Sequence, residues 1–274
     1  MKSAGIIVIL IFIVSGCDKD DPIRYLEFIS IPPGTFALGY ADSSTIDYSY
    51  DILKYEVTNE FYFKFLRTSL NNEALTLNDE YVAGWYAGDS LFPAGEYPYL
   101  YYGDADGPIS RDGNKFILDG EFKNHPVVYV TWYGAKAFAE YHAARLPTAD
   151  EWEKAARGSN YFWFPWGNDL SGERANYFGS SDPYESNSIP TTPAGYYNDD
   201  HDTEDSPGFY GTYDQFGNVE EWTSSIYSFG AYNLRIVRGS SWATSLRPFP
   251  NIWQKGSYYP DKGNSTIGFR IVRD

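Results

Sequence analysis

The stretch from Asp214 to Trp222 reads DQFGNVEEW and gathers oxygen-bearing side chains around a glycine. Asp214 and Glu221 can each offer carboxylate oxygens. Gly217 permits a tight turn that would aim the carbonyls of residues 217 and 219 at one point. Two carboxylates and two carbonyls, without nitrogen or sulfur, suit a hard cation such as Ca²⁺. The spacing is thus compatible with a metal-binding loop, and a solvated turn is the alternative that it leaves open.

A catalytic carboxylate pair is a third interpretation of this stretch, through Glu220 and Glu221. Adjacent residues of a regular element point in different directions, so their side chains rarely converge on one substrate atom. We therefore expect no general acid–base pair here. If Glu221 binds a metal, Glu220 should face away from it and Trp222 should pack into the core.

The first residues resemble an export signal rather than part of a fold. Lys2 precedes an apolar run over residues 4–14 that is too short to span a membrane and typical of a signal peptide. The run ends in VSGC, which resembles a bacterial lipobox; a signal peptide with a stray cysteine is the alternative. Residues 1–16 are therefore predicted to be a lipoprotein signal peptide, and residues 17–26 an acidic tether. Lipidated Cys17 would anchor the chain to a membrane.

Composition limits the partners and the chemistry. Cys17 is the only cysteine, so the exported part would have no disulfide, no thiolate metal site and no cysteine nucleophile. A net charge of −16 disfavours nucleic acid and suits divalent cations. An aromatic content of 19% excludes disorder and indicates a core of large rings. We expect an exported protein, lipid-anchored to the bacterial cell envelope at the outer membrane or cell surface.

Three helices are predicted, over residues 58–70, 131–144 and 148–158. Each begins with a threonine as candidate N-cap, and the third adds a capping box of Thr148 with Glu151. The rest of the chain is expected to be mostly loop, ordered by aromatic packing or bound metal. Short extended segments are expected at residues 36–38, 127–130, 235–238 and 268–272.

The order of the motifs is specific to one family. IPPGTFALG, YEVTNEFYFKFL, HPVVYVTWYGAKAFAEY, RLPTADEWEKAARG, YGTYDQFGNVEEWTSS, RIVRGSSW and IGFRIVRD follow one another along residues 27–274. This order resembles the formylglycine-generating enzyme family, also called the sulfatase-modifying factor domain. The resemblance implies a single α+β domain with an irregular, loop-rich fold related to C-type lectin folds. Residues 71–124 would be an enlarged segment between the first two helices.

The resemblance also implies calcium as a cofactor. In the family, the loop matching DQFGNVEEW is a calcium site. Carried over to this sequence, its ligands are the Asp214 side chain, the Gly217 and Val219 carbonyls and the Glu221 side chain. The family often has asparagine at the position of Asp214, and aspartate should bind calcium at least as well.

A second calcium site of the family begins at the segment matching ANYFG. There the resemblance assigns the side chain of Asn176 and the carbonyl of Tyr177. The remaining ligands should lie near SDPYESNSI, where Asp182, Glu185 and Ser186 are open alternatives.

The redox chemistry of the family needs thiols that this chain lacks. Its enzymes oxidise a sulfatase cysteine to formylglycine with two cysteines that hold copper. Thr244 and Phe249 stand at those positions in RGSSWATSLRPF. Neither side chain binds Cu(I), so no copper and no cysteine oxidation are expected. The histidines, His125, His142 and His201, are scattered and give little support to a transition-metal centre.

Two functions remain open. The first is a binding or structural module of the cell envelope, with an envelope protein or a glycan as partner. The aromatic-rich segment 71–124 would supply its recognition surface, unless those rings only pack an enlarged loop. The second is an enzyme of the same family that uses the retained pocket, with Ser241, Thr244 and Arg247 as candidate polar groups. An open cleft near Ser241 and Thr244 would favour the enzyme, and a plug of Phe249 or Trp253 the binding module.

Overall fold

The computed structural model describes residues 26–274 except 103–106, 185–189, 231 and 246–250. The predicted signal peptide, Cys17, Arg247 and Phe249 therefore lie outside the described residues, as do two of the three alternatives for the second calcium site. Within the described ranges, no helix is both long and apolar enough to cross a membrane.

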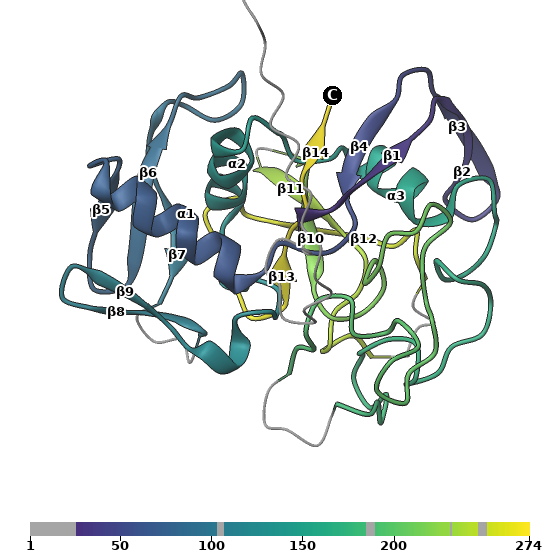
Figure 1. Cartoon of the computed structure of the whole chain (residues 1–274). Coiled ribbons are helices and arrows are strands. Elements are labelled where there is room, and N and C mark those ends of the chain that lie inside the picture. Colours follow the sequence, from purple (N-terminus) through teal and green to yellow (C-terminus); the bar gives the residue numbers. More distant parts are fainter. Residues whose placement is uncertain (1–25, 103–106, 185–189, 231, 246–250) are drawn as a thin grey trace, which may run out of the picture.

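A four-stranded sheet lies at the centre of the molecule (Figure 1). Its two longest strands, β10 and β11, form an antiparallel hairpin in which Glu221 pairs with Arg238, and β13 runs parallel to the start of β10. This pairing on both sides fixes the end of the loop of residues 214–219, called the acidic loop below, at an inner strand of the sheet. In order across the sheet, the strands are β12 (Lys255–Tyr258), β11 (Tyr232–Arg238), β10 (Glu220–Phe229) and β13 (Ile267–Gly268).

A second sheet joins the two ends of the described chain. β4 (Tyr50–Leu53) lies between β1 (Phe28–Ile31) and β14 (Val272–Arg273), and both neighbours are antiparallel to it. The hairpin of β2 (Gly34–Leu38) and β3 (Asp42–Ile46) packs beside this sheet and α3 (Figure 1).

The three predicted helices are confirmed as α1 (Asn59–Asn71), α2 (Trp132–Tyr141) and α3 (Ala149–Arg157). In α3, the Thr148 hydroxyl accepts from the backbone of Glu151 while the Glu151 carboxylate accepts from the backbone of Thr148, which is the predicted capping box. The second helix is capped by its preceding threonine as well, whereas the first has no side-chain cap.

Segment 71–124 is not a long loop, so that expectation was wrong. It forms two antiparallel sheets held by aromatic pairs such as Tyr81 and Tyr101, whose ring centroids lie 5.5 Å apart. Residues 127–130 are likewise not a strand and pair only at an isolated bridge. The elements of this segment are β5 (Leu75–Leu77), β6 (Tyr81–Tyr86), β7 (Gly95–Tyr101), β8 (Ile109–Asp112), β9 (Lys115–Leu118) and the short helix η2 (Gly120–Phe122).

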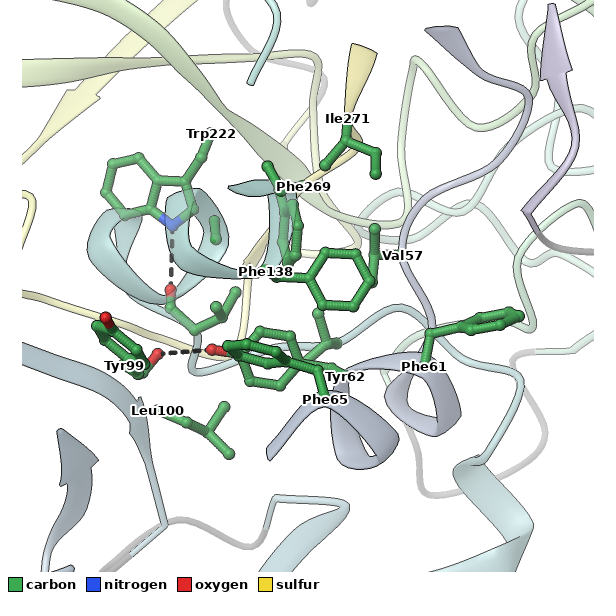
Figure 2. Close-up of a cluster of buried hydrophobic side chains, with 14 of the residues drawn as sticks. Val57, Phe61, Tyr62, Phe65, Tyr99, Leu100, Phe138, Trp222, Phe269 and Ile271 are labelled. Carbon is green, nitrogen blue, oxygen red and sulfur yellow. Dashed lines mark hydrogen bonds between the residues drawn. The ribbon is translucent and has the colours of Figure 1, made fainter. Parts of the chain in front are cut away.

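The main core ties this segment to the central sheet (Figure 2). Tyr62 of α1 stacks on Phe138 of α2, and its hydroxyl donates to the Tyr99 carbonyl over 3.3 Å. Trp222 of β10 is fully buried, as expected, and its indole N–H donates to the Val130 carbonyl. The start of β10, and with it the loop that precedes it, is thereby fixed to the segment that leads into α2. By contrast, the loop predicted over residues 158–232 is confirmed as far as residue 219, where the described residues contain no helix or strand. Its last part was wrong, because residues 220–229 form β10.

Candidate functional site

The loop before β10 makes the tight turn expected of it. Asp214, Gly217 and Asn218 all have positive φ, at 59°, 85° and 57°. A Cβ on Gly217 would lie only 2.4 Å from the carbonyl oxygen of Asn176, so the position requires glycine both for its backbone angle and for space.

A backbone hydrogen bond joins the two predicted calcium segments. The backbone N–H of Asn218 donates to the Asn176 carbonyl over 2.8 Å, and the Asn176 side chain donates to the Pro190 carbonyl. Both Asn176 and Tyr177 are buried. Asp182 is also buried, but its two carboxylate oxygens accept from Ser180 and Tyr184 and cap its own turn.

Glu221 lies at the end of the loop and is held by a cation. Its two oxygens accept from the Arg270 guanidinium, each over 2.7 Å, and one of them also accepts from the Trp152 indole. All three side chains are completely buried. Glu221 is therefore positioned rigidly, and a calcium ion bound to it would have to share the carboxylate with Arg270.

Glu56 belongs to this site, although the sequence analysis did not single it out. Its carboxylate accepts from the Asn218 side chain over 2.7 Å and from the Val219 backbone over 3.3 Å. Burial, followed by the charges of Asp214 and Glu221, raises the pKa of the Glu56 carboxyl well above its usual value. In the sequence, the one sign of a role for Glu56 was its place in the family motif YEVTN, because the residue lies 162 positions before its partner Asn218.

The site carries more negative than positive charge. Burial raises the pKa of Asp214 to about 6, against a hydrogen bond from Gly195 and the charge of Arg270. Arg270 is the cation that faces the three buried carboxylates Glu56, Asp214 and Glu221. An excess of two negative charges among buried groups favours either protonation of a carboxylate or binding of a cation. The donors are all oxygen, so their chemistry fits Ca²⁺.

The geometry does not by itself define a metal centre. In the part of the chain that the structure describes, no group of three or more His, Cys, Asp or Glu side chains is arranged to hold a metal ion. Carbonyls and carboxamides supply most of the predicted ligands, so the calcium assignment stays a prediction.

Glu220 lies apart from Glu221 and does not form a pair with it. Its carboxylate accepts from the Tyr258 hydroxyl over 3.1 Å, on the β12 side of the sheet, while Glu221 faces Arg270. Burial raises the pKa of Glu220 to about 7, against this hydrogen bond. The two side chains have separate partners, which removes the geometric basis for an acid–base pair.

Thr244 stands at the position of the first family cysteine, and its hydroxyl is hydrogen-bonded within its own turn. The Thr244 oxygen accepts from the Ser241 backbone over 2.9 Å and lies 3.4 Å from the Ser241 hydroxyl. The Thr244 carbonyl accepts from the backbone of Phe178, next to the second predicted calcium segment. Trp253, considered above as a plug, packs against Tyr40 and an exposed tryptophan.

A cavity of about 440 Å³ lies beside Trp242, which is within the turn of Ser241 and Thr244. Trp242 forms one wall, and its backbone N–H donates to the Asn218 carbonyl over 2.9 Å. The cavity is thus joined directly to the acidic loop. The end of the enlarged segment contributes Asp119 and Phe122 to the walls. Tyr129, Thr191 and Ser265, from three other parts of the chain, complete them.

A histidine lies behind the cavity wall. The Nδ1 of His125 is 2.9 Å from the Thr191 hydroxyl, and its Nε2 is 3.0 Å from the Tyr184 hydroxyl. Burial lowers the pKa of His125 to about 4, so the ring is neutral at pH 7. Thr191 is therefore the one cavity residue with a histidine on its hydroxyl among those described.

Comparison with protein families gives one match over nearly the whole chain. The model described as the sulfatase-modifying factor enzyme 1-like domain matches residues 17–274. A mouse protein named inactive Cα-formylglycine-generating enzyme 2 is 29% identical over 91% of this chain and 82% of its own length. A formylglycine-generating enzyme of Thermomonospora curvata is 30% identical over 73% of this chain and 71% of its own length.

A serine/threonine-protein kinase, pkn1 of Chlamydia pneumoniae, is also similar, at 32% identity over 62% of this chain. The match covers 27% of that kinase, so the chain spans about a quarter of the length of this relative. Two solved structures are similar to this chain. One is CarF, with a TM-score of 0.61, and the other is PvdO from Pseudomonas aeruginosa, with a TM-score of 0.62. They cover 91% and 90% of this chain, at 18% identity. These two likenesses confirm the predicted α+β fold.

Proposed function

This chain belongs to the sulfatase-modifying factor family, and we propose that it is a membrane-anchored, calcium-binding recognition module of the cell envelope that does not oxidise cysteine. The observation that carries the proposal is one connected unit. The acidic loop, the Asn176 segment and the wall of the 440 Å³ cavity are linked by backbone hydrogen bonds through Asn218 and Trp242.

The missing thiols argue against the oxidase reaction. The chain has one cysteine, Cys17, and one methionine, Met1, so residues 26–274 contain no soft sulfur ligand for Cu(I). The hydroxyl of Thr244 is engaged with Ser241, and a hydroxyl does not replace a thiolate in copper binding.

Calcium would act on this unit as a structural ion. Asp214, with the carbonyls of Gly217 and Val219, would hold it beside Glu221, and Asn176 with Tyr177 would hold a second one. A bound ion would neutralise the excess charge of the buried carboxylates and stiffen the turn that carries Asn218. Because the Asn218 carbonyl bonds to the Trp242 backbone, the cavity wall would be ordered by the same ion.

The cavity has the chemistry of a recognition pocket. Three aromatic residues, Phe122, Tyr129 and Trp242, line it together with the Asp119 carboxylate at an exposed position. Aromatic walls with one acid suit an apolar group that carries a positive charge. The partner would be an envelope protein or a glycan that presents such a group, held near the membrane by lipidated Cys17.

Two experiments with the purified lipidated chain test this function. A sulfatase-derived cysteine peptide is incubated with the protein and copper, and mass spectrometry should detect no aldehyde product. Envelope proteins and glycans are then captured with and without calcium. We expect a partner that needs both calcium and Trp242 and is lost with Trp242→Ala, while Trp163→Ala, an exposed tryptophan elsewhere, retains it. Aldehyde formation, or capture unaffected by Trp242→Ala, would refute the proposal.

An enzyme with changed chemistry is the second candidate, and the Thr191–His125 contact is the observation that favours it. A hydroxyl bonded to a histidine at a cavity wall is the arrangement of an activated nucleophile. Against it, a pKa of about 4 makes His125 a weak base at pH 7. Covalent labelling of Thr191 by a fluorophosphonate, lost with His125→Gln, would favour the enzyme over the recognition module.

A further inference from the structure

A second cavity, of about 370 Å³, is lined by residues of α1 and of the turn of the β8–β9 hairpin. Its walls include three hydrophobic residues, Phe63, Leu70 and Phe116, and two cations, Arg67 and Lys115. A volume in this range is typical of small-molecule sites, which combine apolar walls with a few polar groups.

The charge of this cavity is opposite to that of the whole chain. The net charge is −16, yet neither Arg67 nor Lys115 makes an ion pair with an acidic residue of the described ranges. Asp112 faces Lys115 across the hairpin in register, without an ion pair between them. The guanidinium of Arg67 lies 5.5 Å from the ring centroid of Phe63. Two cations therefore lie at the rim of an apolar floor, and neither is ion-paired with a carboxylate of the described residues.

We propose that this cavity binds an organic monoanion with a short apolar body, of the class of medium-chain carboxylates. The guanidinium of Arg67 can bind a carboxylate through two parallel hydrogen bonds, and Lys115 adds a second charge. The hydrocarbon part would lie against Phe63, Leu70 and Phe116, where its burial is favourable. Inorganic phosphate would satisfy the charges but leave the apolar floor uncovered.

This site is independent of the proposed recognition pocket. The β8–β9 hairpin contributes to both cavities but at opposite ends, with Pro108 and Asp119 beside the larger cavity and Asn114 and Lys115 at the turn beside the smaller one. Loss of the calcium loop or of Trp242 would not remove any wall of the smaller cavity.

The test is calorimetric titration of the purified full-length chain with octanoate, octylammonium and inorganic phosphate. We expect saturable binding of octanoate at one site, and binding at least tenfold weaker for the other two. The double variant Arg67→Gln/Lys115→Gln should weaken octanoate binding by at least about tenfold, because charge-assisted hydrogen bonds are lost. Both side chains are exposed, so the fold should be unaffected, which the melting temperature checks.

The matched control is Lys64→Gln, on the same helix. Lys64 is exposed, is paired with Glu60 and is not part of the cavity wall. It should leave octanoate binding unchanged. No saturable octanoate binding, equal binding of octylammonium or phosphate, or equal losses in the double variant and the control would each overturn the proposal.

Discussion

The backbone N–H of Trp242 donates a hydrogen bond of 2.9 Å to the carbonyl of Asn218. Through this bond, the wall of the larger cavity rests on the turn of the acidic loop. Asn218 in turn bonds to Asn176 and Glu56, so one residue connects both predicted calcium segments, the buried carboxylates and the cavity. The following predictions test that connection.

Calcium removal should lower thermal stability. An ion at about a hundredfold excess over its dissociation constant would stabilise the folded state by ~2.7 kcal/mol. We expect chelation to lower the melting temperature of the wild type, and Asp214→Ala to abolish this sensitivity. Differential scanning fluorimetry with and without chelator measures both. An unchanged wild-type melting curve would remove the support for this site.

Gly217→Ala should be clearly more destabilising than Gly113→Ala. Both glycines have positive φ, so each substitution costs about 1–2 kcal/mol through the backbone. At Gly217 the new methyl group also meets the Asn176 carbonyl, whereas nothing lies within 4 Å at Gly113. Overpacking should add roughly 1–3 kcal/mol. Urea unfolding of the two variants tests this, and equal losses would contradict the packing of the two segments.

Glu221→Gln should lower the free energy of unfolding by about 3–5 kcal/mol, because it leaves the buried Arg270 without its carboxylate. The control is Glu27→Gln, whose partner Lys54 is partly exposed. A surface pair of this kind contributes at most about 1 kcal/mol. Chemical denaturation measures both variants. A small loss for Glu221→Gln would mean that Arg270 is not held by this carboxylate.

Acidification should reduce stability through His125. Its folded-state pKa of about 4 lies below the ordinary value of 6.5, so the unfolded chain binds more protons between these values. The free energy of unfolding therefore falls as pH drops through this window. Between about pH 7 and about pH 5, the wild type should lose roughly 2 kcal/mol more than His125→Gln. Parallel losses in urea unfolding would show that the ring is not held neutral.

The features that could be predicted from the sequence are mostly local. The Thr148–Glu151 capping box lies within four residues, and the tight turn at Gly217 follows from its immediate neighbours. The family motifs gave the fold because their order spans the chain.

The features that were missed depend on distant partners. Glu56 and Asn218 are 162 residues apart, so no local pattern indicates their contact. The strands of segment 71–124 were missed because Gly84 and Pro98 interrupt the alternation of β6 and β7. Contacts between tyrosine rings hold these strands together, and such contacts are not visible in the sequence.

The metal content of the native protein tests the central claim most directly. The full-length protein is purified from its native source without chelator and analysed by inductively coupled plasma mass spectrometry. The account predicts tightly bound calcium, lost in Asp214→Ala, and no copper. Stoichiometric copper without calcium would contradict it.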